Sequence, residues 1–322
     1  MKKKILALIL AAVMILTCAA CGSGSTEAPS GAEAAPAPSE SSKNDSGKVI
    51  APPVKETEPP AAPLADAGTL GKYDVSIGEM EFIQDYSGSP AILIHFTFTN
   101  NSEDNQSAMF SLSCKAFQNG IGLSDATIMD DSIHASEDLM KDIQPGVTID
   151  LTQAYLLSSD TAPVEFYVSE AISFNDDKLG KVFEVAPGGT TVLSVAPGLD
   201  SAVEIGNYSV SVNSYEISKD YNGNPALILN MGYTNNSNGD SPFYAAVEVT
   251  AFQDGIELEK AYYFSDDSLD NTNNYLNVLP GAGCAVAEAF VLTSDTSPVE
   301  IEIAETFSFD DEKITTTIDI TE

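Results

Sequence analysis

The chain has 322 residues with 14 basic and 48 acidic side chains, a formal net charge of −34, and all of its basic residues are lysines. Because affinity for phosphate backbones comes from clustered Lys and Arg, this balance excludes an ordinary nucleic-acid-binding protein. It also argues against a surface that binds anionic lipid head groups. Hydrophobic residues make up 43% of the chain and aromatic residues 8%, which is enough for ordinary cores, and the length allows about two domains.

Residues 1–21 have the features of an export signal. Three lysines at positions 2–4 precede an apolar run over residues 5–20, which falls short of the ~20 residues that a comfortable membrane span needs. The run ends in Cys18-Ala19-Ala20-Cys21-Gly22. This ending resembles a bacterial lipobox, which implies cleavage before Cys21 and attachment of a diacylglycerol to its thiol.

One position departs from the lipobox pattern, because Cys18 stands where an aliphatic residue is usual. Three alternatives therefore remain open: Cys18 as the acceptor, a plain secretory signal, or an uncleaved membrane anchor. With two or more acyl chains a protein stays on a bilayer stably. We expect an exported protein that is lipid-anchored to the outer face of the cell membrane, with the membrane as its partner through that anchor.

Residues 22–68 are predicted to form a disordered tether. They are rich in Pro, Ser, Ala and Glu and contain almost no large apolar side chain. Such a segment cannot bury enough surface to offset its ordering entropy. As a flexible coil it would extend about 35–40 Å, and its prolines would stretch it further.

The remainder of the chain is an internal repeat. When Asp85 is placed on Asp220, the two copies align without a gap. The matching segments include Asp85–Ala91 with Asp220–Ala226, Thr99–Ser102 with Thr234–Ser237, Ala116–Ile121 with Ala251–Ile256, and Ser159–Glu165 with Ser294–Glu300. A repeat this long indicates two copies of one fold rather than a solenoid, whose units have about 20–50 residues.

Each copy reads as all-β. In Ala91–Thr99 the residues at 92, 94, 96 and 98 are apolar and are expected to share the inner face, with Leu93 and His95 on the other. Asn119-Gly120 and Asp254-Gly255 each predict a two-residue hairpin. The strands expected in the first copy are 73–83, 91–99, 110–117, 121–126, 147–157, 164–170 and 179–185.

Segment 127–143 is less regular and is expected to be a long loop or one helical turn. The regular spacing of short strands and turns predicts two tandem immunoglobulin-like β-sandwiches, residues 69–186 and 203–322, joined by a linker over residues 187–202.

The shared turn and strand-end motifs resemble an uncharacterised domain family. They are Asp-Tyr-x-Gly-x-Pro-Ala, Thr-Asn-Asn-Ser, Phe-Gln-x-Gly-Ile and Asp-Thr-x-Pro-Val-Glu. The resemblance implies a Gram-positive surface lipoprotein with an immunoglobulin-like fold. It implies no reaction, ligand or catalytic residue.

Two cysteines remain in the repeats, one in each copy. Cys114 aligns with Val249, on a face that should also carry Phe110, and Cys284 aligns with Ile149. Both therefore read as small core residues with free thiols. A disulfide and a reactive thiol are the alternatives; inward cysteines in separate sandwiches would not reach the Cα separation of about 4.4–6.8 Å that a bridge needs.

Neither histidine is shared by the copies, since His95 aligns with Asn230 and His134 with Leu269. Neither lies in a metal-ligand spacing, and the chain has no Gly-x-Ser-x-Gly elbow in a strand-to-helix context. We therefore expect a protein that is not an enzyme, with no cofactor and no metal site.

Acidic residues gather in the irregular loop of each copy. Calcium binding by them is left open, but neither loop has the fixed spacing of an EF-hand, and solvated loops are the simpler interpretation. The residues concerned are Asp125, Asp130 and Asp131 in the first copy and Asp266, Asp267 and Asp270 in the second.

The same region of the second copy is aromatic where the first is aliphatic. Rigid aromatic rings beside aspartates can bind a glycan or a protein, because they supply contact area at low entropic cost. Packing of an edge strand and loop is the alternative. The candidate ligand contacts are Tyr262, Tyr263, Phe264, Tyr275, Asp266 and Asp267.

These patterns favour a surface-anchored lipoprotein that displays two sandwich domains as a non-catalytic binding or adhesion module. Its partner would be a cell-wall glycan or an extracellular protein. A structural spacer without a ligand is the first alternative, and a calcium-dependent binder or hydrolase is the second.

Overall fold

A computed structural model describes residues 64–130, 133, 135–173, 177–262, 269–308 and 312–321. The predicted signal, Cys21 and most of the predicted tether lie outside the described residues. No helix within the described ranges is long and apolar enough to cross a membrane.

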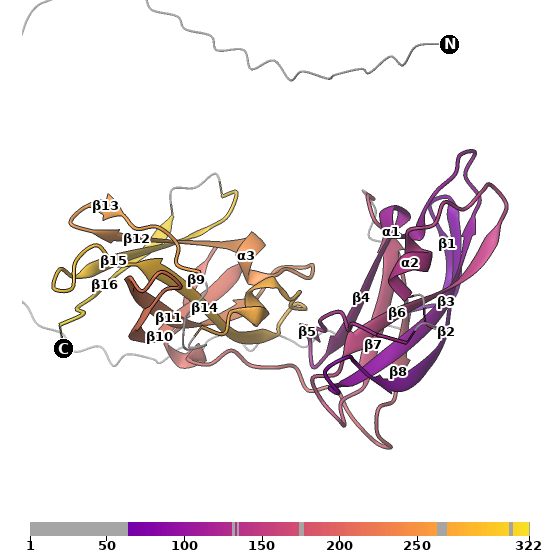
Figure 1. Cartoon of the computed structure of the whole chain (residues 1–322), viewed down its shortest axis with the longest axis horizontal. Helices are drawn as coiled ribbons and strands as arrows, with labels where there is room; N and C mark the ends of the chain where they lie inside the picture. The colour runs from indigo at the N-terminus through magenta and orange to yellow at the C-terminus, as the bar shows by residue number, and fades with distance from the viewer. Residues whose placement is uncertain are drawn as a thin grey trace, which may run out of the picture. The chain divides into compact units, whose positions relative to one another are not determined.

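The first repeat forms a sandwich of two antiparallel four-stranded sheets (Figure 1). One sheet has the order β1-β2-β3-β6 and the other β5-β4-β7-β8. The strands are β1 (Ala67–Leu70), β2 (Tyr73–Gln84), β3 (Pro90–Asn100), β4 (Leu112–Gln118), β5 (Ile121–Gly122), β6 (Thr148–Leu156), β7 (Val164–Glu170) and β8 (Lys178–Phe183). Two short helices, α1 (Ala108–Ser111) and α2 (Ala135–Leu139), lie in the connections.

The second repeat has the same strand order, β9-β10-β11-β14 and β13-β12-β15-β16. Its strands are β9 (Val203–Ile205), β10 (Tyr208–Lys219), β11 (Pro225–Asn235), β12 (Val247–Gln253), β13 (Ile256–Glu257), β14 (Gly283–Val291), β15 (Val299–Glu305) and β16 (Lys313–Ile318). Its short helices are η1 (Leu199–Ser201), α3 (Phe243–Ala246) and η2 (Thr272–Tyr275). From β2 and β10 onward, each pair of corresponding strands begins at residues that the sequence alignment pairs, which confirms two tandem β-sandwiches.

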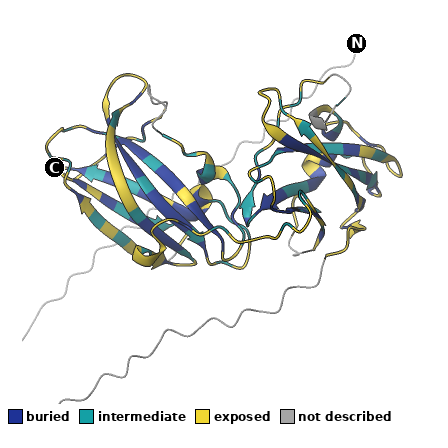
Figure 2. Cartoon of the chain, turned by 90° about the horizontal axis from the view of Figure 1, so that it is seen from below, coloured by how far each residue is buried: buried dark blue, intermediate teal, exposed yellow. Residues whose placement is uncertain are grey.

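Each sandwich encloses its own core. Phe96, Phe98 and Phe166 are fully or almost fully buried in the first, and Met231 and Tyr233 in the second. Buried and exposed residues alternate along many of the strands (Figure 2). This alternation is the period-two pattern that the sequence predicted, because successive side chains of a strand point to opposite faces.

Two predicted strands differ from the structure. The strand expected from residue 110 begins at Leu112, because residues 108–111 form the helical turn α1, and Phe110 is 76% exposed instead of facing the core. The strand expected over 121–126 is only the two residues of β5, after which the chain leaves its sheet. The helix α2 occupies part of the irregular segment 127–143.

The outer face of one sheet is partly covered, which the alternation did not predict. Leu93 was expected on the polar face of its strand but is only 3% exposed. Its counterpart Ile228 is fully buried in a small apolar cluster with Ala226, Ala261 and Ala289. The segment that follows β13 supplies Ala261, so this connection folds over the sheet and makes a second, smaller apolar layer.

Candidate functional site

In the second sandwich the chain that follows β13 runs along the edge strand β14. Lys260 forms an isolated antiparallel bridge with Phe290. The amide of Ala261 donates to the carbonyl of Ala289 at 2.8 Å, and the amide of Val291 donates to the carbonyl of Glu259 at 2.8 Å. These bonds fix the connection against β14, and the side chains on both strands then face a common space.

That space is a cavity of about 850 Å³, a size typical of pockets for small ligands. Apolar, aromatic and charged side chains all contribute to its wall. The lining residues include Tyr244, Lys260, Tyr262, Leu269, Asn271, Tyr275, Glu288, Phe290 and Thr306.

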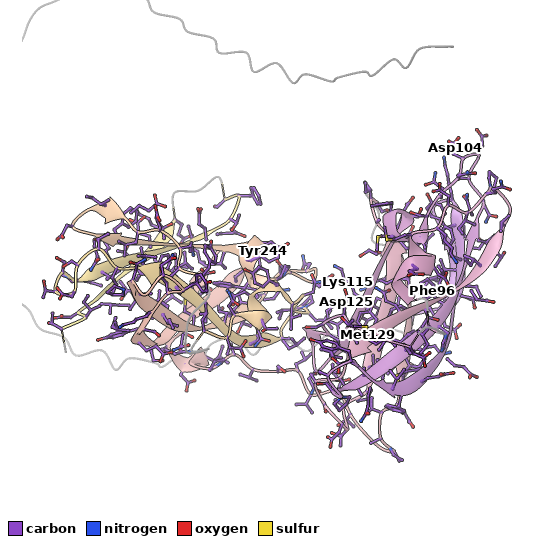
Figure 3. All side chains as sticks on the ribbon, viewed as in Figure 1. Phe96, Asp104, Lys115, Asp125, Met129 and Tyr244 are labelled. Atoms are coloured by element: carbon purple, nitrogen blue, oxygen red, sulfur yellow. The ribbon has the colours of Figure 1, made fainter. Side chains whose placement is uncertain are left out.

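Three tyrosines present their rings at this cavity. Tyr244, Tyr262 and Tyr275 are each 57–58% exposed although they line it. The rings of Tyr244 and Tyr275 lie 5.4 Å apart between centroids at an interplanar angle of 38°; Figure 3 labels Tyr244. Solvent-accessible rings with a polar hydroxyl can stack on a sugar ring or a planar group and donate a hydrogen bond as well.

A charged pair lies in the wall of the same cavity. The ammonium of Lys260 pairs with the carboxylate of Glu288 and lies 4.4 Å from the centroid of the Phe290 ring, a cation–π geometry. Asn274 is buried beside them; its amide donates to the carbonyl of Ala287 at 2.7 Å and to the Glu288 carboxylate at 3.3 Å. The pair is thus held in place before any ligand binds.

One hydroxyl in the wall is unused. The Oγ1 atom of Thr306 is buried and has no hydrogen-bond partner among the residues that the structure describes. Buried polar groups are nearly always paired, so this atom is available to a ligand.

The structure brings two of the predicted ligand contacts, Tyr262 and Tyr275, to one cavity. The other four, Tyr263, Phe264, Asp266 and Asp267, lie outside the described residues. The prediction missed Lys260, Glu288 and Thr306, which are not part of the aromatic cluster in sequence. A comparison of the repeats would have found the first two, since Asp125 and Gln153 occupy the aligned positions.

The described residues contain no group of three or more His, Cys, Asp or Glu side chains that could hold a metal ion. Asp131, His134, Asp266 and Asp267 fall outside the described residues, so calcium binding by the loops stays untested. His95 lies on the outer face of its strand, where its Nδ1 atom is 2.9 Å from the hydroxyl of Thr152.

Cys114 and Cys284 are free thiols in the structure, as predicted. Both pack against the cores of their sandwiches. Desolvation raises the pKa of Cys114 to about 12 and that of Cys284 to about 11. Because the thiolate is the reactive form, burial disfavours nucleophilic chemistry at both side chains near neutral pH.

Comparison with known proteins gives a family. Residues 50–170 and 199–305 match the family model described as "Domain of unknown function (DUF5067)". No curated protein matches the chain. Solved structures that resemble it include one from Staphylococcus aureus subsp. aureus NCTC 8325 described as a "putative lipoprotein", with 16% sequence identity and a TM-score of 0.32; the match covers 41% of this chain and 95% of that one. The two matched regions together span well over half of the 322 residues, one on each sandwich, and the chain therefore belongs to the DUF5067 family, with two of its domains in tandem.

Proposed function

We propose that the protein is an exported lipoprotein, held at the outer face of the cell membrane by a lipid on Cys21, that acts as a non-catalytic binding module. The ligand site is the cavity of the second sandwich, with Tyr244, Tyr262 and Tyr275 as its contact surface. The partner is a cell-wall glycan or an extracellular protein.

The observation that carries this proposal is the solvent-accessible tyrosine cluster on a preformed cavity. A side chain that serves only packing is buried, as Phe243 is with 0% exposure beside this cluster. Tyr244, the next residue, is instead 57% exposed and packs against the ring of Tyr275 in a tilted arrangement. Large exposed rings held in place by a neighbour are typical of binding surfaces, since little side-chain entropy is lost when a ligand covers them.

The binding test compares two double variants. Tyr262→Ala with Tyr275→Ala removes two rings of the cavity, whereas Tyr86→Ala with Tyr221→Ala removes two exposed rings from equivalent β-turns elsewhere. Binding of each to purified cell-wall glycan and to extracellular matrix proteins is measured by sedimentation or surface plasmon resonance. We expect at least a tenfold loss of affinity for the first pair only, with melting temperatures within a few degrees of the parent.

Two results would contradict the proposal. Equal binding by both double variants and the parent would remove the tyrosine cavity as the site. Absence of binding by the parent to every glycan and protein tested would favour the alternative of a structural spacer without a ligand.

The anchor is tested separately from the ligand. Cells expressing the protein are fed a labelled fatty acid, and incorporation is compared between the parent, Cys21→Ala and Cys18→Ala. The lipobox interpretation expects incorporation to disappear in the Cys21 variant and to persist in the Cys18 variant. The reverse pattern would move the anchor to Cys18.

A further inference from the structure

In the first sandwich, the connection after β5 and the edge strand β6 have the same backbone arrangement as the connection after β13 and β14 have around the cavity of the second. This arrangement of connection and edge strand is called the frame below. Asp125 forms an isolated bridge with Tyr155, and these two residues align with Lys260 and Phe290. The amide of Ala126 donates to the carbonyl of Ala154 at 3.0 Å, and the amide of Leu156 donates to the carbonyl of Ser124 at 2.8 Å. The connection after β5 is therefore fixed against the edge strand β6 as its counterpart is against β14.

A smaller cavity of about 310 Å³ lies in this frame. Its wall combines apolar side chains with three polar ones, those of Asp125, Thr127 and Gln153. The residues that line it include Met109, Asp125, Ala126, Thr127, Ile128, Leu139, Gln153 and Ala154; Figure 3 labels Asp125.

The two frames have different polar side chains at aligned positions. Lys260 and Glu288 of the second sandwich form an internal ion pair, and their counterparts are Asp125 and Gln153. The first frame therefore has a carboxylate at the position of the ammonium, and the structure gives it no cation there among the described residues.

Three acceptor groups of the first frame have no partner among the described residues. The Oε1 atom of Gln153 and the hydroxyl of Tyr155 are buried without a hydrogen bond among the residues described, and Tyr155 is only 2% exposed. No ion pair or hydrogen bond to the Asp125 side chain is found among them either. Partial burial, which removes water from the carboxylate, raises the pKa of the Asp125 carboxyl. The residue nevertheless remains accessible to solvent, so a ligand can reach it.

We propose that this cavity binds an organic ammonium ion with a short apolar body. The ammonium takes the role that the Lys260 side chain has in the second sandwich: it pairs with the Asp125 carboxylate and donates a hydrogen bond to Gln153 Oε1. The apolar body packs against Met109, Ile128 and Leu139.

An organic cation fits this wall better than a metal ion does. Calcium takes six to eight oxygen ligands and magnesium requires a near-octahedral set, whereas Asp125 and Gln153 are the only side chains with carboxylate or amide oxygens in the described wall. A primary ammonium has three N–H donors, enough for the carboxylate and the amide oxygen at once, and its alkyl chain covers the apolar remainder.

The test uses n-hexylamine as the probe and a ¹⁵N-labelled form of the protein that begins at residue 22, which retains every core residue of both sandwiches. Amide resonances are followed during titration with n-hexylamine, and in parallel with n-hexanol and hexanoate, which have the same alkyl chain without the positive charge. We expect saturable shifts at Met109, Ala126, Leu139 and Ala154 with the amine, and at least tenfold weaker binding of the other two probes.

Two variants separate charge recognition from apolar binding. Asp125→Asn keeps the shape of the side chain and is expected to weaken amine binding at least tenfold. The double change Asp125→Lys with Gln153→Glu copies the ion pair of the second sandwich and is expected to abolish amine binding and to raise the melting temperature. If the double variant does not fold, Asp125→Asn alone decides.

Equal shifts with amine and alcohol, undiminished amine binding by Asp125→Asn, or no saturable shift at these amides would each overturn the proposal. The result is independent of the function proposed for the second sandwich. Tyr262→Ala with Tyr275→Ala is expected to leave n-hexylamine binding unchanged, and a failure of glycan or protein binding there does not alter the titration here.

Discussion

Two buried asparagines explain why the repeats share the letters Thr-Asn-Asn-Ser. The side-chain amide of Asn100 donates to the carbonyls of Asp104 and Ile143, both at 2.8 Å, and its Oδ1 accepts from the amide and hydroxyl of Ser102 at 2.9 and 2.7 Å. Asn235 makes the same four bonds in the second sandwich. Both donors and both acceptor positions of each amide are thus satisfied, so the first asparagine of the shared motif fixes loops in both sandwiches.

Replacement of Asn100 by leucine should destabilise the protein by about 2–4 kcal/mol, because the carbonyls of Asp104 and Ile143 and the amide of Ser102 lose their partner. Urea denaturation measures the change. Asn101→Ala is the matched control, since the neighbouring Asn101 is exposed and its side chain bonds Asp74 on the surface; its cost is expected below about 1 kcal/mol. Similar losses for both variants would contradict the assigned role.

The two core thiols should resist alkylation. The pKa values of about 12 for Cys114 and about 11 for Cys284 keep both protonated well above the ordinary thiol value of about 8.5. We expect maleimide labelling of the form that begins at residue 22 to stay slow between about pH 7 and pH 9 and to become fast for both residues in urea. Rapid labelling of either residue in the native state would show that its thiol is accessible.

At the scale of elements, the hairpin between β12 and β13 depends on left-handed backbone geometry. Asp254 and Gly255 have φ values of 52° and 76°, the pair of positive angles that a type I′ turn requires. Asn119 and Gly120 repeat this geometry between β4 and β5 with φ values of 53° and 81°. The two-residue signal in the sequence therefore predicted the hairpins correctly.

Gly255→Ala should cost about 1–2 kcal/mol, because a Cβ atom is unfavourable at positive φ. The space around Gly255 is open, so a steric clash with another residue plays no part. Gly239→Ala is the matched control, since Gly239 also faces open space but does not have a positive φ; a change within about 0.5 kcal/mol is expected there. Thermal unfolding of both variants measures the change in stability. An equal loss of stability in the two variants would contradict the role of positive φ at Gly255.

Short elements are the ones that hydrophobic periodicity predicts poorly. Alternation predicted the core face of β3, because a strand with one face in the core has a strict period of two, but it missed the burial of Leu93 on the other face. It placed Phe110 in a strand and extended β5 to residue 126, since a single helical turn and an isolated bridge are too short to show a period. Both errors lie where the chain leaves one sheet for the other.

For the whole molecule, the net charge of −34 should oppose folding through self-repulsion. Salt screens exposed charges with a Debye length of about 10 Å at 0.1 M. We therefore expect the melting temperature to rise between about 10 mM and 500 mM NaCl. An uncharged osmolyte at matched osmolarity should not reproduce the salt curve, and a flat or falling salt curve would contradict this prediction.

The sequence by itself determined that the chain contains two copies of one all-β unit, because the repeat, the period-two alternation and the hairpin residues are all local signals. Only the tertiary structure decided which side chains meet at the cavities. Lys260 and Glu288, or Asp125 and Gln153, are distant in sequence and come together because a connection without regular secondary structure lies along an edge strand. Leu93 is buried on a face that alternation assigns to solvent, and its counterpart Ile228 is buried there with Ala261 of the connection. Contacts between distant segments depend on how the connection packs, and no periodic pattern records that packing.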